Sequence, residues 1–557
     1  MEKIKNYLVL IYLFLGFFAV LPFFHSGFIL VHDNTQVARV LEMAKSLGDG
    51  MSPVRFVPDL GYGFGYPIFN FYAPLPYYIG GILSLIGFGP LLSTNIAFIF
   101  ATLLAGLSMF FLAKEVFGKE AGLVSSIIYL YFPYHALDIF VRGDLGEAFA
   151  YAFLPLVFLG FIKIFQKVEK GKITTIFPWG MFTIFSFTFV ILSHNLSAFM
   201  SLFFIIPFLV AQFFLSKNKT LFISINFLVL ILVFLLSAFY TVPAIFEMKY
   251  TNIFSQVGGG AAYFDHFVCP IQLWDSPWGF GGSAKGCLDG ISFRLGKVNI
   301  ILAGVSILLF FFSKKKHFFV FFAFLLFLFS IFMTTSYSGF IWKLPYMDFL
   351  QYPWRFLIFS GLFLSLIVGY LVSFLINLKQ KYSCLILVFV ITLTLLNNLK
   401  LFSPNGYEYV NYNDSKYLKW TVSKISDEYL PQNFKKPKFE KEVRSSTFDV
   451  VKGIGSVRNL TEKTNYLKTE INLSSNSLVR ANKAYFPGWQ LYVNGKKESF
   501  EVSNDGLYFR LEKGKNLLVL KYFSTSIQQL ANLLSLTGLG AIVVGIIIYS
   551  KKNEKTS

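Results

Sequence analysis

The sequence predicts an α-helical polytopic membrane protein with about twelve transmembrane helices and a β-sandwich domain near its C-terminus. Three observations support this fold class. Of the 557 residues, 55% are hydrophobic and only 14% are charged. Apolar runs long enough to cross a bilayer recur along the chain, with lysine clusters between them. A more polar segment with alternating hydrophobic residues precedes the last apolar run, as is typical of β-strands.

The positive charge of the chain is distributed as expected for a membrane protein. The formal net charge is +19, yet most lysines lie in short clusters between apolar runs. Such clusters orient membrane helices, because basic loops stay on the cytoplasmic side. No RNA-binding or DNA-binding motif is recognisable in the sequence. We therefore expect membrane lipids as partners and no nucleic acid.

The candidate spans are apolar runs of about 20 residues, the length that a helix needs to cross the hydrocarbon core. The first run, residues 7–24, has no small-residue cleavage site after it, so we interpret it as an uncleaved span rather than a signal peptide. The other runs centre near residues 102, 127, 155, 185, 207, 231, 305, 326, 366, 390 and 539.

The lysine clusters determine the predicted topology. Every loop assigned to the cytoplasm is basic if residues 67–88 do not cross the membrane. This stretch is rich in Gly, Pro and Tyr, which suits a juxtamembrane or re-entrant segment. The pattern predicts a multi-pass plasma-membrane protein with an even number of spans and both termini in the cytoplasm. The basic residues of these loops are Lys114, Lys119, Lys163, Lys167, Lys170, Lys172, Lys217, Lys219, Lys314, Lys315, Lys316, Lys379, Lys381, Lys551 and Lys552.

This topology divides the chain into three parts. Residues 1–398 form the transmembrane domain, with large outer loops at 25–91 and 241–297. Residues 399–527 form an extracytoplasmic, mainly β domain, because segments such as SLVRANKAYF and NLLVLKYF alternate in hydrophobicity between turn residues. Residues 528–557 form the last transmembrane helix and a basic cytoplasmic tail.

The first outer loop contains the strongest catalytic candidate. The run HDNTQVARVLEMAKSL predicts an amphipathic helix with Asp33 at its start. Asp33 and Gln36 together are also typical of a helix cap, which needs no catalysis. Further along the loop, Arg55 and Asp59 stand among tyrosines, where they would bind a phosphate or a sugar. The tyrosines alone are equally explained as interfacial aromatic residues.

Ionisable residues also occur at the predicted outer ends of membrane spans, where they usually face a cavity or a partner. Arg142 and Glu147, in YHALDIFVRGDLGEAFAYAFLP, either form a structural ion pair or line a polar site together with Asp138 and Asp144. His194 and Asn195, in ILSHNLSAF, mark either a helix end at the interface or part of the same cavity.

The middle outer loop, more than about fifty residues long, is unusual unless it binds something. Glu247 stands at its start, and Cys269 and Cys287 are the only two cysteines placed to form a disulfide. Arg355, in LQYPWRFL, is positioned for an anionic lipid headgroup or, alternatively, serves as a topological anchor beside an aromatic belt.

In their order along the chain, several segments resemble the bacterial multi-pass membrane proteins labelled 6-pyruvoyl-tetrahydropterin synthase-related. These proteins look like members of the GT-C glycosyltransferase superfamily. The ending, YFPGWQLYVNGKK followed by GLYFRLEKGKNLLVLKYF, is similar to the C-terminal β domain of YfhO-like membrane glycosyltransferases. The six histidines are scattered, so no zinc-dependent pterin chemistry is expected. The resembling segments are HDNTQ, PDLGYGFGYPIFNFYAPLPYY, VRGDLGEAFAYAFLP, LSHNLSA, SPWGFGGS, DGISFRLG, LQYPWRFL and DEYLPQ.

The resemblance implies a GT-C-like fold and an enzyme that moves a sugar from a polyprenyl-phosphate-linked donor to a hydroxyl of a saccharide or glycolipid acceptor on the extracytoplasmic face. It implies that Asp33 is the catalytic base. The chain has one acid in His32-Asp33-Asn34, where such enzymes often have two, so no cofactor is assigned and a divalent metal stays open. Two alternatives remain: a transporter or flippase of a lipid-linked saccharide, and a non-catalytic assembly protein with a glycan-binding domain.

Overall fold

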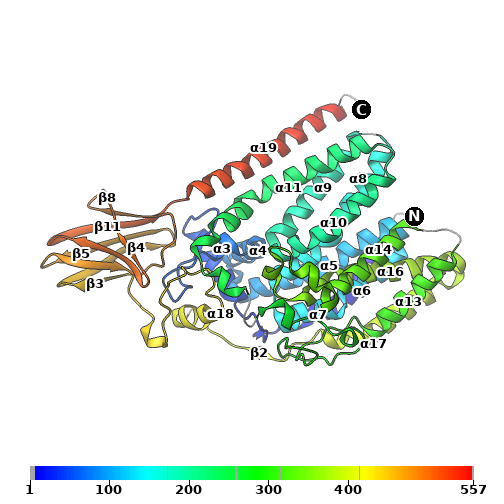
Figure 1. Cartoon of the computed structure of the whole chain (residues 1–557), viewed down its shortest axis with the longest axis horizontal. Coiled ribbons are helices and arrows are strands. Elements are labelled where there is room, and N and C mark those ends of the chain that lie inside the picture. The colour runs from blue at the N-terminus through cyan, green and yellow to red at the C-terminus, as the bar shows by residue number, and fades with distance from the viewer. Residues whose placement is uncertain (1–6, 172, 258–260, 314–316, 413, 555–557) are drawn as a thin grey trace.

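The computed structural model describes residues 7–554 except 172, 258–260, 314–316 and 413. The predicted basic residues Lys172, Lys314, Lys315 and Lys316 lie outside these described residues. Figure 1 shows a helical bundle with the strands of residues 448–522 gathered at one end and with the C-terminal helix α19 (Ser526–Glu554) extending away from them along the bundle. The side of the membrane that each end faces stays a prediction.

The described part of the chain contains nine helices that are long and apolar enough to cross a membrane. Two further spans arise if each of two bent helix pairs crosses as one unit, and a shorter apolar helix, α13, contains residue 305. All twelve predicted span centres therefore fall in apolar helices. The main helices are α1 (Tyr7–Val20), α5 (Pro90–Phe117), α6 (Lys119–Leu130), α7 (Pro133–Leu137), α8 (Leu145–Glu169), α9 (Ile173–Ser193), α10 (Asn195–Leu215), α11 (Lys219–Glu247), α13 (Lys297–Phe312), α14 (Phe318–Thr334), α16 (Leu357–Leu378), α17 (Ser383–Asn398) and α19 (Ser526–Glu554).

A break after α6 creates the irregular backbone that carries the polar residues. The chain bends by 40° between α6 and the segment Pro133–Arg142. Proline disfavours helical backbone in the residue before it, and Phe132 is accordingly extended. After α7 the chain forms a π-helical turn, Asp138–Arg142, which ends at Gly143 with a φ of 70°. Glycine adopts this left-handed conformation without steric cost, so the chain can turn sharply into α8.

The first loop folds into short helices packed on the bundle. These are α2 (Gln36–Gly48), α3 (Ile68–Phe71) and α4 (Leu75–Leu83). The predicted helix after Asp33 is present, but Arg39 and Glu42 are buried together with its apolar residues, so α2 is covered on most sides. A glycine at position 80 allows α4 to approach α2, because a Cβ there would lie 2.7 Å from a methyl group of Val40. The stretch 75–88 is apolar but shorter than the spanning helices.

The C-terminal β domain consists of two antiparallel sheets. One has the order β3-β6-β10-β9 and the other the order β4-β5-β11-β7-β8. Inward-facing residues such as Ile471, Val479 and Leu518 are buried, which places the core of the domain between the sheets. The strands are β3 (Phe448–Lys452), β4 (Gly455–Lys463), β5 (Tyr466–Leu473), β6 (Ser477–Ala481), β7 (Trp489–Val493), β8 (Lys496–Glu498), β9 (Glu501–Ser503), β10 (Gly506–Leu511) and β11 (Gly514–Tyr522).

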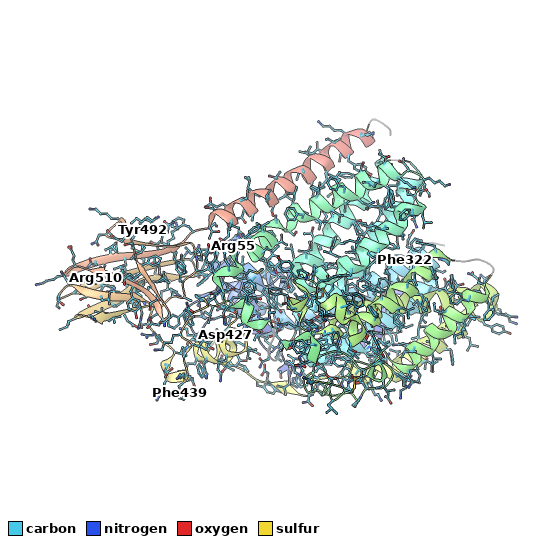
Figure 2. All side chains as sticks on the ribbon, viewed as in Figure 1. Arg55, Phe322, Asp427, Phe439, Tyr492 and Arg510 are labelled. Carbon is cyan, nitrogen blue, oxygen red and sulfur yellow. A yellow bond between two sulfur atoms is a disulfide. The ribbon has the colours of Figure 1, made fainter. Side chains whose placement is uncertain are left out.

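Residues 399–447, which precede these strands, have little β structure and pack against the first loop. Strand β1 (Phe28–Ile29) of that loop pairs antiparallel with β2 (Tyr407–Glu408). The hydroxyl of Tyr62 donates to Asp427 over 3.0 Å, and that of Tyr66 donates to Glu428 over 3.2 Å. These hydrogen bonds attach the first loop to the DEYLPQ segment, which precedes the β domain in the chain. Figure 2 shows Asp427 and Arg55 where the bundle meets this domain.

Glu42 makes the stability of this first loop dependent on pH. The side chain is buried, and one carboxyl oxygen accepts a hydrogen bond from the backbone N–H of Asp59. Burial, and then the negative charge of Asp59, raises the pKa of Glu42 to about 8. The unfolded chain ionises Glu42 near its ordinary pKa of 4.5. Between these two values only the folded protein keeps the proton, so stability falls as pH rises through this window.

We expect the Glu42→Gln variant to lose most of this pH dependence, because glutamine does not ionise. The measurement is the thermal unfolding midpoint of detergent-purified protein between about pH 5 and about pH 9. Equal slopes for the wild type and the variant over this range would contradict the assignment.

Candidate functional site

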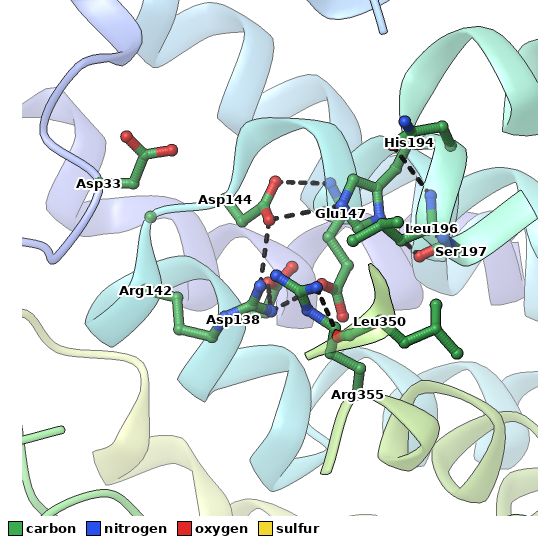
Figure 3. Close-up of polar contacts among 12 residues, drawn as sticks. Asp33, Asp138, Arg142, Asp144, Glu147, His194, Leu196, Ser197, Leu350 and Arg355 are labelled. Carbon is green, nitrogen blue, oxygen red and sulfur yellow. Dashed lines mark hydrogen bonds and ion pairs between the residues drawn. The ribbon is translucent and has the colours of Figure 1, made fainter. Parts of the chain in front are cut away.

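Arg142 is the centre of a buried cluster of charged side chains. Its guanidinium donates to Asp138 over 2.6 Å, to Glu147 over 2.7 Å and to Asp144 over 3.1 Å. The side chains of Asp138 and Glu147 are fully buried, and that of Arg142 is 9% exposed. Figure 3 shows these groups facing one another. The ion pair between Arg142 and Glu147 is formed and lies within a larger polar cluster, whereas a role of that cluster in lining a substrate site stays a prediction.

The local sequence explains how this cluster forms. The π-helical turn brings Asp138 and Arg142 onto one side, and Gly143 reverses the chain. Asp144 then caps α8, since its carboxylate accepts a 2.9 Å hydrogen bond from the backbone N–H of Glu147. Glu147 therefore lies in the first turn of α8, and its side chain points to Arg142. The hydroxyl of Tyr134, on α7, donates to the other oxygen of the Glu147 carboxylate over 2.5 Å.

His194 supplies a nitrogen ligand atom beside the carboxylate oxygens of Asp144 and Glu147. It precedes α10, and its Nε2 lies 3.8 Å from a carboxylate oxygen of Asp144. One ligand atom from each of these three residues lies within 4.8 Å of the others. The Nδ1 of His194 accepts a 3.3 Å hydrogen bond from the backbone N–H of Ser197, which makes His194 the N-cap of α10, and it lies 2.8 Å from the hydroxyl of Ser197. Because Nδ1 accepts this bond, the proton of the neutral ring is on Nε2, on the side of Asp144, and a cation bound there would replace that proton.

These three side chains fit a divalent cation by their chemistry. Two carboxylates and one imidazole are a ligand set that several divalent metals accept. The wider cluster contains three carboxyl groups but only two guanidinium groups, those of Arg142 and Arg355. One oxygen of Asp138 is buried without a hydrogen-bond partner among the described residues. When all three carboxyl groups are ionised, their negative charge exceeds the charge of the two guanidinium groups, and a bound cation compensates the difference.

Backbone hydrogen bonds hold Asp33 beside this cluster. The N–H of His32 donates to the carbonyl of Val141, and that of Asp33 donates to the carbonyl of Arg142, each over 2.9 Å. The Asp33 side chain is 28% exposed. Figure 3 shows Asp33 next to the chain that leads from Arg142 to Asp144. The first loop and the start of α8 thus contribute carboxylates to one region of the molecule.

The predicted helix cap at Asp33 is wrong. Thr35 occupies the cap position of α2 and makes no capping hydrogen bond through its side chain. Asp33 instead accepts hydrogen bonds from the side chains of Thr35, of Gln36 over 2.8 Å and of Arg39 over 3.1 Å. A carboxylate has about four lone-pair positions, so these three donors orient the group and leave room for a further proton donor.

Arg39, Tyr72 and Tyr77 complete this region and were not predicted. The guanidinium of Arg39 lies 4.4 Å over the ring of Tyr72 and 3.4 Å from the hydroxyl of Tyr77. The pKa of Tyr72 is raised by burial first and then by the charge of Asp144, which links the Asp33 region electrostatically to the acidic cluster. The tyrosines stand in the resembling segment NFYAPLPYY. The sequence does not mark Arg39 as a site residue, because it stands at a polar position of an amphipathic helix, where an exposed arginine is expected.

Arg355 lies at the other side of the cluster. Only 8% of this residue is exposed, and its guanidinium donates a 2.9 Å hydrogen bond to the carbonyl of Leu350 and lies 5.3 Å over the ring of Tyr352. Its Nε is buried without a hydrogen-bond partner among the described residues. The neighbouring Trp354 ring stacks under the guanidinium of Arg142 at 4.8 Å. The LQYPWRFL segment therefore provides both a platform for Arg142 and a second, largely unpaired cation.

The remaining predicted site residues lie elsewhere. Arg55 donates to Asn70 and Asn532, and Asn70 donates to Glu247, so Arg55 and Glu247 belong to a buried network that joins α11, α19 and the first loop. Asp59 forms a 2.6 Å ion pair with Lys45 on the surface of α2. Asn195 is exposed, with its side chain turned back to its own helix. Roles in substrate binding for these four residues stay predictions.

The middle loop is held together by a disulfide between Cys269 and Cys287. Asp289 accepts hydrogen bonds from Gln272 and Ser283 inside the same loop. Two contacts attach the loop to the site. The ring nitrogen Nε2 of His32, next to Asp33, is 3.0 Å from the carbonyl of Phe280.

The second attachment of the middle loop is an aromatic stack. The ring of Phe293 stacks on that of Trp354 with a centroid distance of 5.8 Å. Trp354 in turn lies under Arg142. The loop therefore contacts the site both beside Asp33 and beside Arg142.

Comparison with known proteins relates this geometry to a family. Residues 69–402 match the family described as 6-pyruvoyl-tetrahydropterin synthase related domain, a membrane protein. An uncharacterised protein of Lactococcus lactis subsp. cremoris (strain MG1363) is 26% identical over 263 residues, which are 45% of this chain and 41% of that protein. The chain thus matches less than half the length of this relative.

Among solved structures, the Archaeoglobus fulgidus oligosaccharyltransferase tethered with an acceptor peptide containing the NVT sequon aligns with a TM-score of 0.51 and 15% identity. The alignment covers 80% of this chain and 61% of the enzyme. A second structure of that enzyme, in complex with Zn and sulfate, aligns with a TM-score of 0.42 and 16% identity over 80% of this chain and 59% of that one. The first alignment confirms the predicted GT-C-like fold.

Proposed function

Because the chain belongs to the 6-pyruvoyl-tetrahydropterin synthase related family of membrane proteins, and because it has a GT-C-like fold, we propose that it is a membrane glycosyltransferase. It transfers a sugar from a polyprenyl-phosphate-linked donor to a hydroxyl of a saccharide or glycolipid acceptor. The single observation that carries this proposal is the backbone pairing of Asp33 with Arg142, which brings a partly exposed carboxylate to a buried cluster of acids and arginines.

Asp33 acts as the general base of this reaction. Its carboxylate is held by Gln36 and Arg39 and is open on one side. A proton acceptor of this kind makes an acceptor hydroxyl nucleophilic as it attacks the sugar carbon. Direct attack opposite the leaving phosphate inverts the configuration at that carbon. The carboxylate of Asp33 takes the hydroxyl proton, and the bond between the sugar and the phosphate oxygen breaks.

Arginines near the base bind the lipid phosphate that leaves. Arg355 has donor groups without carboxylate partners among the described residues, and it is buried where its charge is poorly screened by water. A guanidinium binds phosphate oxygens through paired hydrogen bonds, which strengthen as negative charge develops. Arg142 is already shared among three acids, so we assign it to orienting them and Arg355 to the phosphate.

A divalent cation fits the donor set of Asp144, Glu147 and His194. When bound, such an ion supplies positive charge that offsets the negative charge of a phosphate. The residues of the chain hold the ligand atoms in position: Asp144 is fixed by its capping bond, Glu147 by Tyr134 and His194 by Ser197.

We expect the Glu147→Gln variant to bind Mn²⁺ at least about tenfold more weakly than the wild type, because it replaces a charged ligand by a neutral one. The measurement is Mn²⁺ titration of chelator-treated protein followed by electron paramagnetic resonance. Glu512→Gln, which removes an exposed carboxylate of the β domain, is the matched control. Equal Mn²⁺ affinity in Glu147→Gln and the wild type would remove the cation from the proposal.

The reaction itself is tested with purified protein in nanodiscs. Incubation with a polyprenyl-phosphate-linked sugar and a saccharide acceptor should yield a glycosylated product and free polyprenyl phosphate. Movement of the sugar lipid across vesicles, without any covalent transfer, would instead support the transporter alternative. Absence of transfer over a panel of donors and acceptors, with a cellular effect that persists in Asp33→Ala, would support the assembly protein.

A further inference from the structure

In the disulfide-bridged middle loop, the indole N–H of Trp278 and the guanidinium of Arg294 have no acceptor among the described side chains. The indole Nε1 of Trp278 is buried and has no hydrogen-bond partner among the described residues. The guanidinium of Arg294 lies 5.7 Å over the ring of the same tryptophan. It makes no hydrogen bond or ion pair with any described side chain. The nearby Asp275 is already paired with Lys297 over 2.9 Å.

Such an arrangement costs stability unless something binds to it. Partial burial lowers the pKa of the Arg294 guanidinium, and the charge of Asp275 opposes this effect without cancelling it. A buried N–H without an acceptor, such as that of Trp278, is also unfavourable. Proteins rarely keep a buried N–H such as that of Trp278 without an acceptor, and functional sites are the common exception.

The position of these donors connects them with the proposed reaction. Phe280, two residues after Trp278, contacts His32 beside Asp33. Phe293, the residue before Arg294, stacks on Trp354 beside Arg142. Trp278 and Arg294 therefore stand on the segment that borders the site on both sides. The disulfide and the hydrogen bonds of Asp289 hold this segment in a defined shape.

We propose that Trp278 and Arg294 form a binding site for an oxyanion, a phosphate or carboxylate group carried by a saccharide substrate. The inference rests on the proposed function, because it identifies the class of substrate that this function uses. The guanidinium binds the oxyanion by charge-assisted hydrogen bonds, and the indole N–H provides a third donor. Arg355 lies inside the bundle and serves the lipid phosphate, whereas Arg294 is half-exposed on the loop and receives a group on the sugar side.

Binding is measured on the full chain without any turnover, so the result does not depend on glycosyl transfer. One arm titrates detergent-purified protein with glucose 1-phosphate by isothermal calorimetry. The other arm titrates undecaprenyl phosphate into nanodiscs of neutral lipid and follows tryptophan fluorescence. We expect Arg294→Gln to weaken binding of glucose 1-phosphate by at least about tenfold, the loss typical of a charged hydrogen bond.

Two further variants keep the test decisive. Trp278→Phe keeps an aromatic ring and removes only the N–H, so it should weaken binding by a smaller factor. Lys285→Gln removes a positive charge from the same loop, but this side chain is 82% exposed and pairs with Asp265, so binding should be unchanged. Thermal unfolding of each variant establishes that it is folded.

Each outcome decides the proposal. A loss in Arg294→Gln for glucose 1-phosphate alone supports a site for the sugar substrate. A loss for undecaprenyl phosphate alone overturns that assignment, because the oxyanion would then be the lipid phosphate. Equal binding by the wild type and Arg294→Gln in both arms, or no binding by the wild type, overturns the site. Failure of glycosyl transfer, by contrast, leaves these binding results as they are.

Discussion

The Asp33→Asn variant should lose sugar transfer by about 10²–10⁴-fold in kcat, the usual contribution of a general base. Asparagine has the shape of aspartate and still accepts a hydrogen bond from Gln36 or Arg39 through its carbonyl oxygen. It cannot take the proton of an acceptor hydroxyl. The first loop should therefore keep its fold while the chemical step fails. The measurement is release of polyprenyl phosphate under single-turnover conditions.

A base and a binding residue are distinguished by the pattern of the kinetic loss. Loss of a base lowers kcat and leaves the apparent affinity for the donor nearly unchanged. Asp414→Asn is the matched control, since Asp414 is an exposed aspartate whose carboxylate accepts a hydrogen bond from the backbone N–H of Lys416. Should Asp33→Asn turn over as fast as Asp414→Asn, the general-base assignment would fail.

The sequence predicts the spans well because a lipid solvent imposes a simple requirement on composition. Each predicted centre falls in an apolar helix, including α13, which has only 16 residues. The breaks within spans are less visible. The bend before Pro133 has a sequence signal, because proline ends a helix. The 90° bend after α14 has no such signal, since no proline or glycine stands between Thr334 and Ser336.

The candidate site is predictable only in part, for a related reason. Arg142, Glu147 and His194 stand out because ionisable residues at the ends of spans are costly and therefore conspicuous. Residues of the first loop follow no such rule. Arg39 approaches Asp33, whereas Arg55 is equally basic and binds Asn532 near the C-terminus. Tertiary packing determines which of these two arginines approaches Asp33, and the local sequence does not predict this packing.

The partners of Glu247 show the same limit over a longer distance. Its carboxylate accepts hydrogen bonds from Asn70 and from Gln528, residues that stand more than 170 and 280 positions away. A buried acid at the end of a span predicts that some partner exists. Which partner it has depends on how α19 docks on α11, and that is a property of the folded chain.

Arg142→Gln should be among the most destabilising single substitutions in the helical domain, by about 3–5 kcal/mol, because it leaves buried carboxylates without their cation. Three acids share this guanidinium, and none of them is more than 9% exposed. The measurement is reversible unfolding in mixed micelles. Arg510→Gln, which removes an exposed arginine of the β domain, is the matched control and should change stability little.

The double variant Arg142→Gln, Asp138→Asn separates charge from packing. Asp138 is fully buried and makes the shortest contact with Arg142, so its charge is the most costly to leave unpaired. Neutralising it should recover a large part of the stability that Arg142→Gln loses, and the coupling energy of the double-mutant cycle should exceed about 1 kcal/mol. If the two losses simply add, the arginine stabilises the cluster by packing against Trp354. If they couple, the excess of buried negative charge is real, and the same excess is what favours a divalent cation at Asp144, Glu147 and His194.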